Sequence, residues 1–139
     1  MVAALAVVGS LVALTPASGG RIHLEPTVYD FGDVGQDVVS TSVRLHNAGA
    51  STLVVRGVST SCMCTTARVV YGGTVSPIFG YHSNPAWSLS LPPDAEARLE
   101  VFYDPTVHPE LGHYVRQIYV GSSDPEQREA ILEIHVREV

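Results

Sequence analysis

Apolar and polar residues alternate with a period of two along most of the chain. In a β-strand successive side chains point to opposite faces, so this alternation predicts half-buried strands. The predicted strands cover residues 39–45, 53–58, 97–103, 114–120 and 130–136. No segment carries a sustained apolar stripe of helical period, so we expect few or no helices.

Turn signals separate these strands at short intervals. Asn47 and Gly49 follow the first strand, and both residue types tolerate the positive φ that tight turns require. Short strands with such spacing and no helices between them predict an all-β, immunoglobulin-like antiparallel sandwich of about 7 to 8 strands. We assign the sandwich to residues 21–139 as a single domain.

One segment, residues 72–93, departs from this rhythm because it is rich in Gly and Pro. It contains Trp87, the only tryptophan, and the dipeptide Tyr81-His82. We expect one long loop here, and long loops in small domains are often functional. The alternative interpretation is an insertion that is packed by its own aromatic side chains.

Residues 1–20 have a different composition from the rest of the chain. The apolar run from Val2 to Leu14 is shorter than the roughly 20 residues of a membrane span. It has the length of a signal-peptide core, and Thr15 to Ala17 supply small residues for cleavage. We therefore expect a signal peptide or a truncated membrane anchor. Either predicts export to the periplasm, the cell surface or the outer face of the cytoplasmic membrane.

Composition narrows the possible partners. Hydrophobic residues make up 45% of the chain and the net charge is -6. The first value predicts a folded core, and the second argues against nucleic acid or an anionic membrane as an electrostatic partner. Contact with a membrane is expected only through residues 1–20. The sequence carries no local catalytic or phosphate-binding motif, so a protein partner is the main expectation.

Cys62-Met63-Cys64-Thr65 is the main candidate for chemistry. Two cysteines separated by one residue point the same way in an extended strand. Three interpretations remain open. The thiols are reduced and simply pack; they form a disulfide; or they bind a soft metal. A fully extended strand would place the two Cα atoms about 6.6–6.8 Å apart, at the limit of disulfide reach, so a disulfide requires a local bend.

The metal interpretation draws on more of the chain. Two thiolates suit Cu(I) or Zn(II), and thioether and imidazole ligands can complete such a site. Met63 lies between Cys62 and Cys64, and His82 in the long loop is the better candidate for a third ligand. No other cofactor is expected.

Three pieces of sequence together carry a family resemblance. They are Asp30-Phe31-Gly32, the turn from Asn47 to Gly49, and Ser61-Cys62-Met63-Cys64-Thr65. In this order they resemble the bacterial domain-of-unknown-function family 1573, and the later Ser123-Asp124-Pro125 turn matches it too. The resemblance runs from about Glu25 to the C-terminus. That family is similar in fold to major sperm protein and to the ASPM, SPD and Hydin type of domain.

The resemblance implies an exported immunoglobulin-like domain with no established activity. Phe31 is expected to plug one end of the core, and Gly32 to let the chain turn without a Cβ clash. Two features depart from the family pattern: Met63 stands where Gly is usual, and the 72–93 segment is longer. We conclude that a non-enzymatic binding or assembly module is the leading hypothesis. The alternative is a Cu(I)- or Zn-binding or thiol-redox protein.

Overall fold

The computed structural model describes residues 19–139, so nearly all of the predicted export segment, residues 1–20, lies outside the described part. Residues 19–139 form ten β-strands and no helix. In this part of the chain, accordingly, there is no helix with the length and hydropathy needed to cross a membrane. The strands are β1 (Ile22–Glu25), β2 (Val28–Val34), β3 (Val39–Asn47), β4 (Leu53–Thr60), β5 (Thr65–Tyr71), β6 (Thr74–Val75), β7 (Ser88–Leu91), β8 (Glu96–Tyr103), β9 (Gly112–Ser122) and β10 (Glu129–Glu138).

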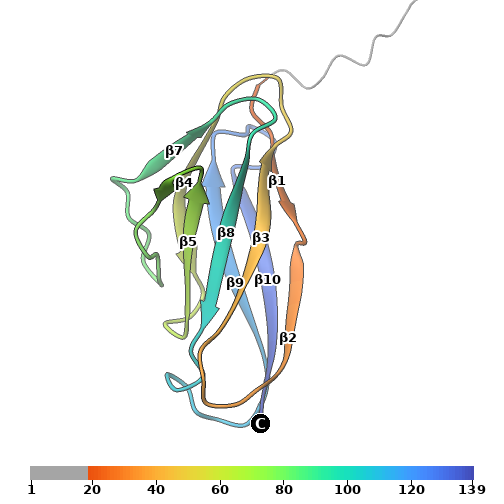
Figure 1. Ribbon diagram of the computed structural model, residues 1–139, viewed down its shortest axis with the longest axis vertical. Helices are drawn as coiled ribbons and strands as arrows, with labels where there is room; N and C mark the ends of the chain where they lie inside the picture. The colour runs from red at the N-terminus through yellow and green to blue at the C-terminus, as the bar shows by residue number, and fades with distance from the viewer. Residues whose placement is uncertain (1–18) are drawn as a thin grey trace, which may run out of the picture.

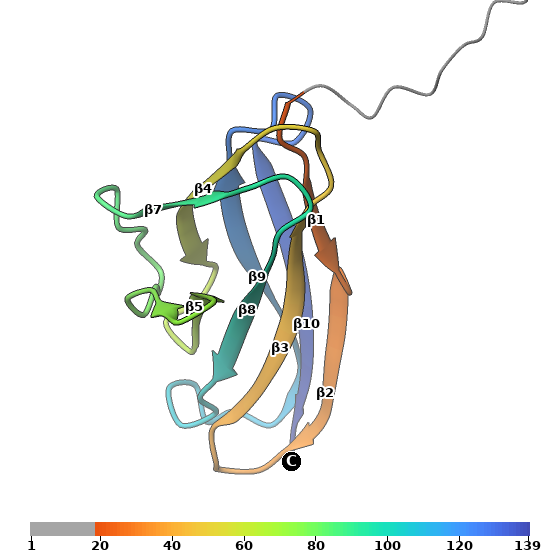
Figure 2. The same cartoon turned by 45° about the horizontal axis from the view of Figure 1, so that its top comes forward.

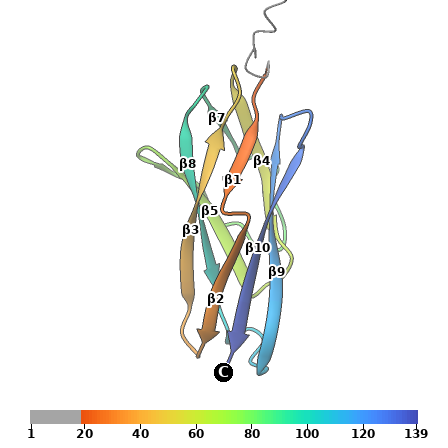
Figure 3. The ribbon, with the colours of Figure 1, turned by 90° about the vertical axis from the view of Figure 1, so that its right-hand side faces the viewer.

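The strands form two sheets that pack face to face (Figure 1, Figure 3). One sheet has the order β1-β3-β8-β5-β6, and the other has the order β2-β10-β9-β4-β7. Neighbouring strands run antiparallel, except for β2 and β10, which are parallel. The prediction of an immunoglobulin-like sandwich is confirmed. The strands beyond the expected number are the short β6 and β7.

The core follows the predicted alternation. Val43 and Leu45 of β3 point inward, directly opposite Leu99 and Ala97 of β8, and all four side chains are buried. Cross-strand apolar pairs of this kind stabilise a sheet and fix its register, because a slip of one residue would expose the whole set. The same period of two therefore sets both the strands and their pairing.

The chain changes sheets at Pro26. Before it, β1 pairs with β3; after it, β2 pairs with β10. Proline has no N–H to donate to a ladder, so it ends β1. Within β2, Phe31 and Gly32 introduce one extra residue relative to β10, and Gly32 has a φ of 70°, which favours glycine. Phe31 is half-buried against the edge of the core, with its ring 5.0 Å from that of Tyr29.

The segment expected as one loop, residues 72–93, contains two short strands, β6 and β7. β7 is labelled in Figure 2. Leu91 of β7 pairs with Leu53 of β4, so the segment extends the second sheet by one strand. The aromatic residues anchor the rest: Phe79 is 1% exposed and its ring lies 5.0 Å from that of Trp87. A single pair of alternating leucines is too short a pattern to predict a strand, which explains the difference.

Asn47 ties together the end of the sandwich where the chain enters. Its buried side-chain Oδ1 accepts hydrogen bonds from the backbone N–H groups of Arg21 and Gly49, at 3.1 and 3.0 Å. Its Nδ2 donates to three backbone carbonyls, at 2.9, 2.9 and 3.1 Å, belonging to Ser51, Leu91 and Pro92.

Gly49 lies beside this network, where no larger residue fits. A Cβ atom built on Gly49 would lie 2.0 Å from the carbonyl oxygen of Gly19. The Asn-x-Gly turn therefore depends on both residues: Asn47 joins the segments, and Gly49 lets two of them approach.

We predict that Asn47→Asp lowers the free energy of unfolding by about 3 kcal/mol, because it removes both N–H donors of the buried amide and sets a carboxylate against three carbonyl oxygens. Asn84→Asp is the matched control: Asn84 is exposed, and its Oδ1 accepts from Ala86, a bond that a carboxylate keeps. Urea unfolding of both variants is the measurement. Equal stabilities of the two variants would contradict the role of Asn47.

Candidate functional site

The cysteine motif forms a tight turn between β4 and β5. These two strands belong to opposite sheets, so the turn connects the two layers of the sandwich. The hydroxyl of Thr60 lies 2.9 Å from the carbonyl oxygen of Cys62 and 2.7 Å from that of Thr65. The carbonyl of Cys64 accepts from the backbone N–H of Asp104, at 2.8 Å. The turn is thus held from inside by Thr60 and from the adjacent β8–β9 loop by Asp104.

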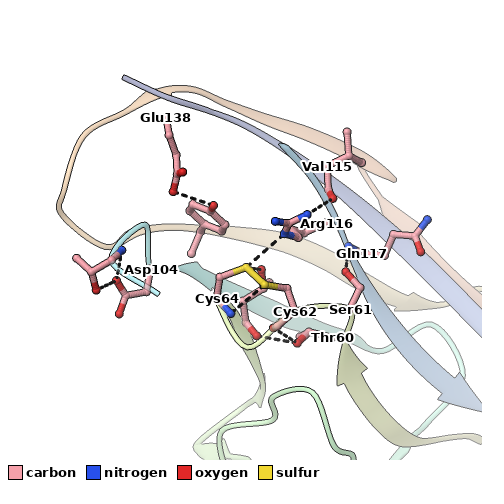
Figure 4. Close-up of a disulfide and its surroundings, with 12 residues drawn as sticks. Thr60, Ser61, Cys62, Cys64, Asp104, Val115, Arg116, Gln117 and Glu138 are labelled. Atoms are coloured by element: carbon pink, nitrogen blue, oxygen red, sulfur yellow. Dashed lines mark hydrogen bonds between the residues drawn. A yellow bond between two sulfur atoms is a disulfide. The ribbon is translucent and has the colours of Figure 1, made fainter. Parts of the chain in front are cut away.

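The bend brings Cys62 and Cys64 together as a disulfide, with Cα atoms 5.2 Å apart (Figure 4). Of the three interpretations of the motif (packed thiols, a disulfide or a metal site), the structure therefore contains the disulfide. Both cysteines belong to the buried core, with Cys62 9% exposed and Cys64 1% exposed. The backbone N–H of Cys64 points at the sulfur of Cys62, at 3.2 Å.

Arg116 brings a charged group into contact with the disulfide. Its Nε donates to the sulfur of Cys64 at 3.3 Å, and its Nη1 donates to the carbonyl of Val115 at 3.1 Å (Figure 4). The guanidinium also lies over the ring of Tyr114, 5.1 Å from the centroid. Arg116 occupies β9 in step with the buried Ile118, so it projects from the inward-facing side of the strand.

Next to this group, Tyr103 and Glu138 form a buried pair. The Tyr103 hydroxyl donates to Glu138 Oε1 at 3.0 Å. Burial, and then the hydrogen bond to the Glu138 carboxylate, raise the pKa of Tyr103 from its ordinary 10.0 to about 12. The phenol therefore stays a neutral donor throughout the physiological range.

Met63 and His82, the other proposed metal ligands, differ in position: Met63 lines surface hollows beside Cys62 and Cys64, whereas His82 lines neither hollow. Met63 is 75% exposed, and His82 is exposed with its ring 4.9 Å from that of Tyr81. Among residues 19–139, no three His, Cys, Asp or Glu side chains lie close enough together to hold a metal ion. A disulfide offers no thiolate, so the Cu(I) or Zn site stays a prediction for the reduced protein.

Two residues that the sequence analysis did not select lie at the motif. Arg116 is one, and alternation could have revealed it, because it falls on the apolar face of the predicted strand 114–120. His108 is the other: it lines a surface hollow together with Cys62 and Met63. No sequence signal marks His108, because its position depends on how the β8–β9 loop folds back toward the turn.

Exposed apolar side chains surround the turn on the outer side of the first sheet. A second hollow lies there, and four of the side chains that line it are large, apolar and 40–75% exposed. We call these four residues the Met63 surface: Val38, Met63, Ile78 and Val107. Large apolar groups scattered singly are common on proteins, but a group around one hollow is typical of an interaction site.

Comparison with known proteins agrees with the resemblance drawn from the sequence. Residues 22–74 match the model of the family described as "Protein of unknown function (DUF1573)". The match includes the Phe31-Gly32 opening, the Asn47 turn and the cysteine motif, and it ends near the start of the 72–93 segment. No curated protein matches the sequence significantly.

Solved structures show the fold. A protein of unknown function from Porphyromonas gingivalis W83 is 21% identical, with a TM-score of 0.67 over 92% of this chain. This chain spans 51% of that protein's length. The ASH/PapD-like domain 7 of human CEP192 is 11% identical, with a TM-score of 0.52 over 100% of this chain and 98% of that domain.

The chaperone YadV is 17% identical, with a TM-score of 0.55 over 84% of this chain and 51% of that one. Similar folds also occur as parts of enzymes, among them a glycoside hydrolase from Clostridium perfringens, of which this chain covers 23%. At these identities the likeness shows the fold alone. The chain therefore has an immunoglobulin-like sandwich fold.

We predict that Tyr103 makes the stability of the protein fall between pH 10 and pH 12. The phenol loses its proton near pH 10 in the unfolded chain but only near pH 12 in the native protein, so its contribution is complete below pH 10 and is lost as the pH rises through 12. Denaturant unfolding across this range should show a shallower fall for Tyr103→Phe than for the wild type. Tyr119→Phe serves as the control, and a Tyr103→Phe profile parallel to the control would contradict the assignment.

Proposed function

We propose that this chain is a non-enzymatic binding module, exported from the cytoplasm, which receives an extended apolar segment of a partner protein on the Met63 surface. The observation that carries the proposal is the cluster of exposed apolar side chains around one hollow at the disulfide turn. Covering such side chains removes apolar area from water, which is the main driving force of protein association. The net charge of -6 disfavours nucleic acid as the occupant.

The shape of the sheet edges supports an extended occupant. Most edges are poor templates for another strand: β6 has two residues, β1 and β7 have four each, and β2 carries Asp30 and Asp33. The edge of β3 differs, because β1 pairs only with Arg44–Asn47. The remainder, residues 39–43, is uncharged and β-branched at most positions, and it begins directly after Val38 of the Met63 surface.

These two features suit one occupant. The free edge of β3 faces away from β8 and β5, over which the hollow lies, and the two features meet at Val38. An extended segment can therefore pair with residues 39–43 of β3, and its continuation past Val38 can cover the hollow with apolar side chains. The YadV structure is described as that of a chaperone. A role in holding or assembling another protein is in keeping with that likeness.

Export rests on two further observations. The composition of residues 1–20 is that of a signal peptide or an anchor. Disulfides persist in oxidising compartments and are rare in the cytoplasm, so the Cys62–Cys64 bond favours a location outside the cytoplasmic membrane.

We predict that a photo-reactive amino acid placed at Ile78 cross-links, in the native host, to an extended apolar segment of another protein. Mass spectrometry of the cross-linked peptide identifies that segment. Val107→Glu should lower the yield about tenfold, because it puts a charge into the apolar contact. The matched control is Ile131→Glu, which changes another exposed apolar residue, on β10 of the opposite sheet.

Three outcomes would contradict the docking proposal. The first is equal loss of cross-linking with Val107→Glu and Ile131→Glu. The second is a cross-link only to a second copy of this chain, which would make the surface a self-association site. The third is a cross-linked peptide that is charged or helical in its own protein.

We predict that the mature protein is found outside the cytoplasm and begins after Ala17, because the small residues from Thr15 to Ala17 follow the apolar run. Fractionation of the host, followed by intact-mass measurement, tests both points. A full-length membrane-bound protein would instead identify residues 1–20 as an anchor. A cytoplasmic protein that retains Met1 would refute export.

A further inference from the structure

The Cys62–Cys64 disulfide is poorly suited to be a structural crosslink. In the chain-entropy description a disulfide stabilises by restricting the unfolded chain, and the effect grows with the length of the closed loop. This bond spans a single residue, Met63, so it restricts little. The turn is also held independently by Thr60 and by the backbone of Asp104. We therefore infer that the disulfide does not serve mainly to stabilise the fold.

Arg116 gives the two sulfurs an electrostatic environment that favours a thiolate. Its Nε lies 3.3 Å from the sulfur of Cys64, and its side chain takes part in none of the ion pairs formed among residues 19–139. A disulfide sulfur carries no net charge. The guanidinium acquires an anionic partner there only when Cys64 is released as a thiolate.

One further group favours the same state. The hydroxyl of Thr65 lies 3.4 Å from the sulfur of Cys64 and can donate to its thiolate, whereas the backbone N–H of Cys64 lies 3.2 Å from the sulfur of Cys62. Hydrogen bonds to a charged form stabilise that form and lower the pKa of its acid. A lower thiol pKa makes Cys64 the better leaving group in thiol–disulfide exchange.

Access to the two sulfurs is unequal. Cys62 is 9% exposed and lines the surface hollow that also includes Met63, Tyr81 and His108, whereas Cys64 is 1% exposed. Cys64 lines the second hollow but is almost wholly covered, so the larger exposed fraction of Cys62 makes it the residue that an incoming thiolate meets first. The electrostatics and the access therefore assign complementary roles: Cys62 is the sulfur that is attacked, and Cys64 is the sulfur that leaves.

We propose that Cys62–Cys64 is a redox-active disulfide that is reduced by a dithiol, with Arg116 stabilising the Cys64 thiolate. One donor thiolate attacks the sulfur of Cys62; a mixed disulfide forms, and the electron pair of the broken S–S bond goes to Cys64. The second donor thiolate then attacks the donor sulfur of the mixed disulfide, which releases Cys62 as a thiolate and leaves the donor as a disulfide. Two electrons pass from the dithiol to the protein. This activity goes beyond the proposed binding function and does not depend on it.

The test uses oxidised full-length protein with dithiothreitol as the dithiol, quenched by alkylation and read by intact mass over time. The wild type should be reduced under native conditions. Arg116→Gln should slow reduction about three- to tenfold, since the leaving thiolate loses its cation. Arg128→Gln is the matched control, because Arg128 is exposed and forms none of the contacts to the disulfide. Arg116→Lys should retain most of the rate.

A second measurement separates electrostatics from folding defects. In a Cys62→Ser background Cys64 is a single thiol, and its pKa follows from thiolate absorbance against pH. Arg116→Gln should raise this pKa by about one unit, a tenfold change in the ionisation equilibrium. Equal reduction rates for Arg116→Gln and Arg128→Gln, or an unchanged Cys64 pKa, would overturn the proposal. So would a wild-type disulfide that dithiothreitol reduces only after unfolding.

Discussion

The buried amide of Asn47 holds together the end of the sandwich where the chain enters and where segments of both sheets meet. Its oxygen and nitrogen together bind backbone groups before β1, in the β3–β4 turn and in the β7–β8 turn. β1 and β3 belong to one sheet, whereas β4 and β7 belong to the other, so a single side chain spans the two layers. Because an unpaired buried amide is costly, each of these segments has one position in which the network is complete.

The opposite end of the sandwich, near the disulfide, contains polar and charged side chains in inward-facing positions. There the inward-facing position of β9 carries Arg116 instead of an apolar residue, and Tyr103 of β8 shares a buried hydrogen bond with Glu138 of β10. Apolar side chains at this end would have a lower free-energy cost of burial, since buried polar and charged groups require compensating partners. The disulfide end therefore contains several polar side chains. Asn47 and the aliphatic core hold the strands that position these side chains.

Alternation and turn residues predicted most of the fold, because both act locally. The buried positions of β3 and β8 follow the period of two, and Asn47 and Gly49 mark the turn that the structure builds around them. The short β7 could not be predicted, since its pairing depends on Leu53 of a distant strand. The state of Cys62 and Cys64 was also open, because the bend that joins them relies on the Thr60 hydroxyl and on Asp104 from another loop.

The two histidines, His82 and His108, differ in the same way. His82 was selected because it lies in the Gly- and Pro-rich segment nearest in sequence to the cysteines, yet His108, from a loop two strands later, lies at the hollow beside Cys62. Arg116 is different again, since its inward position follows from alternation alone. A charged residue in step with buried ones must have a partner, and here it faces a sulfur that becomes anionic only on reduction. The pattern of the strand thus already contained the strongest indication of chemistry at this end of the protein.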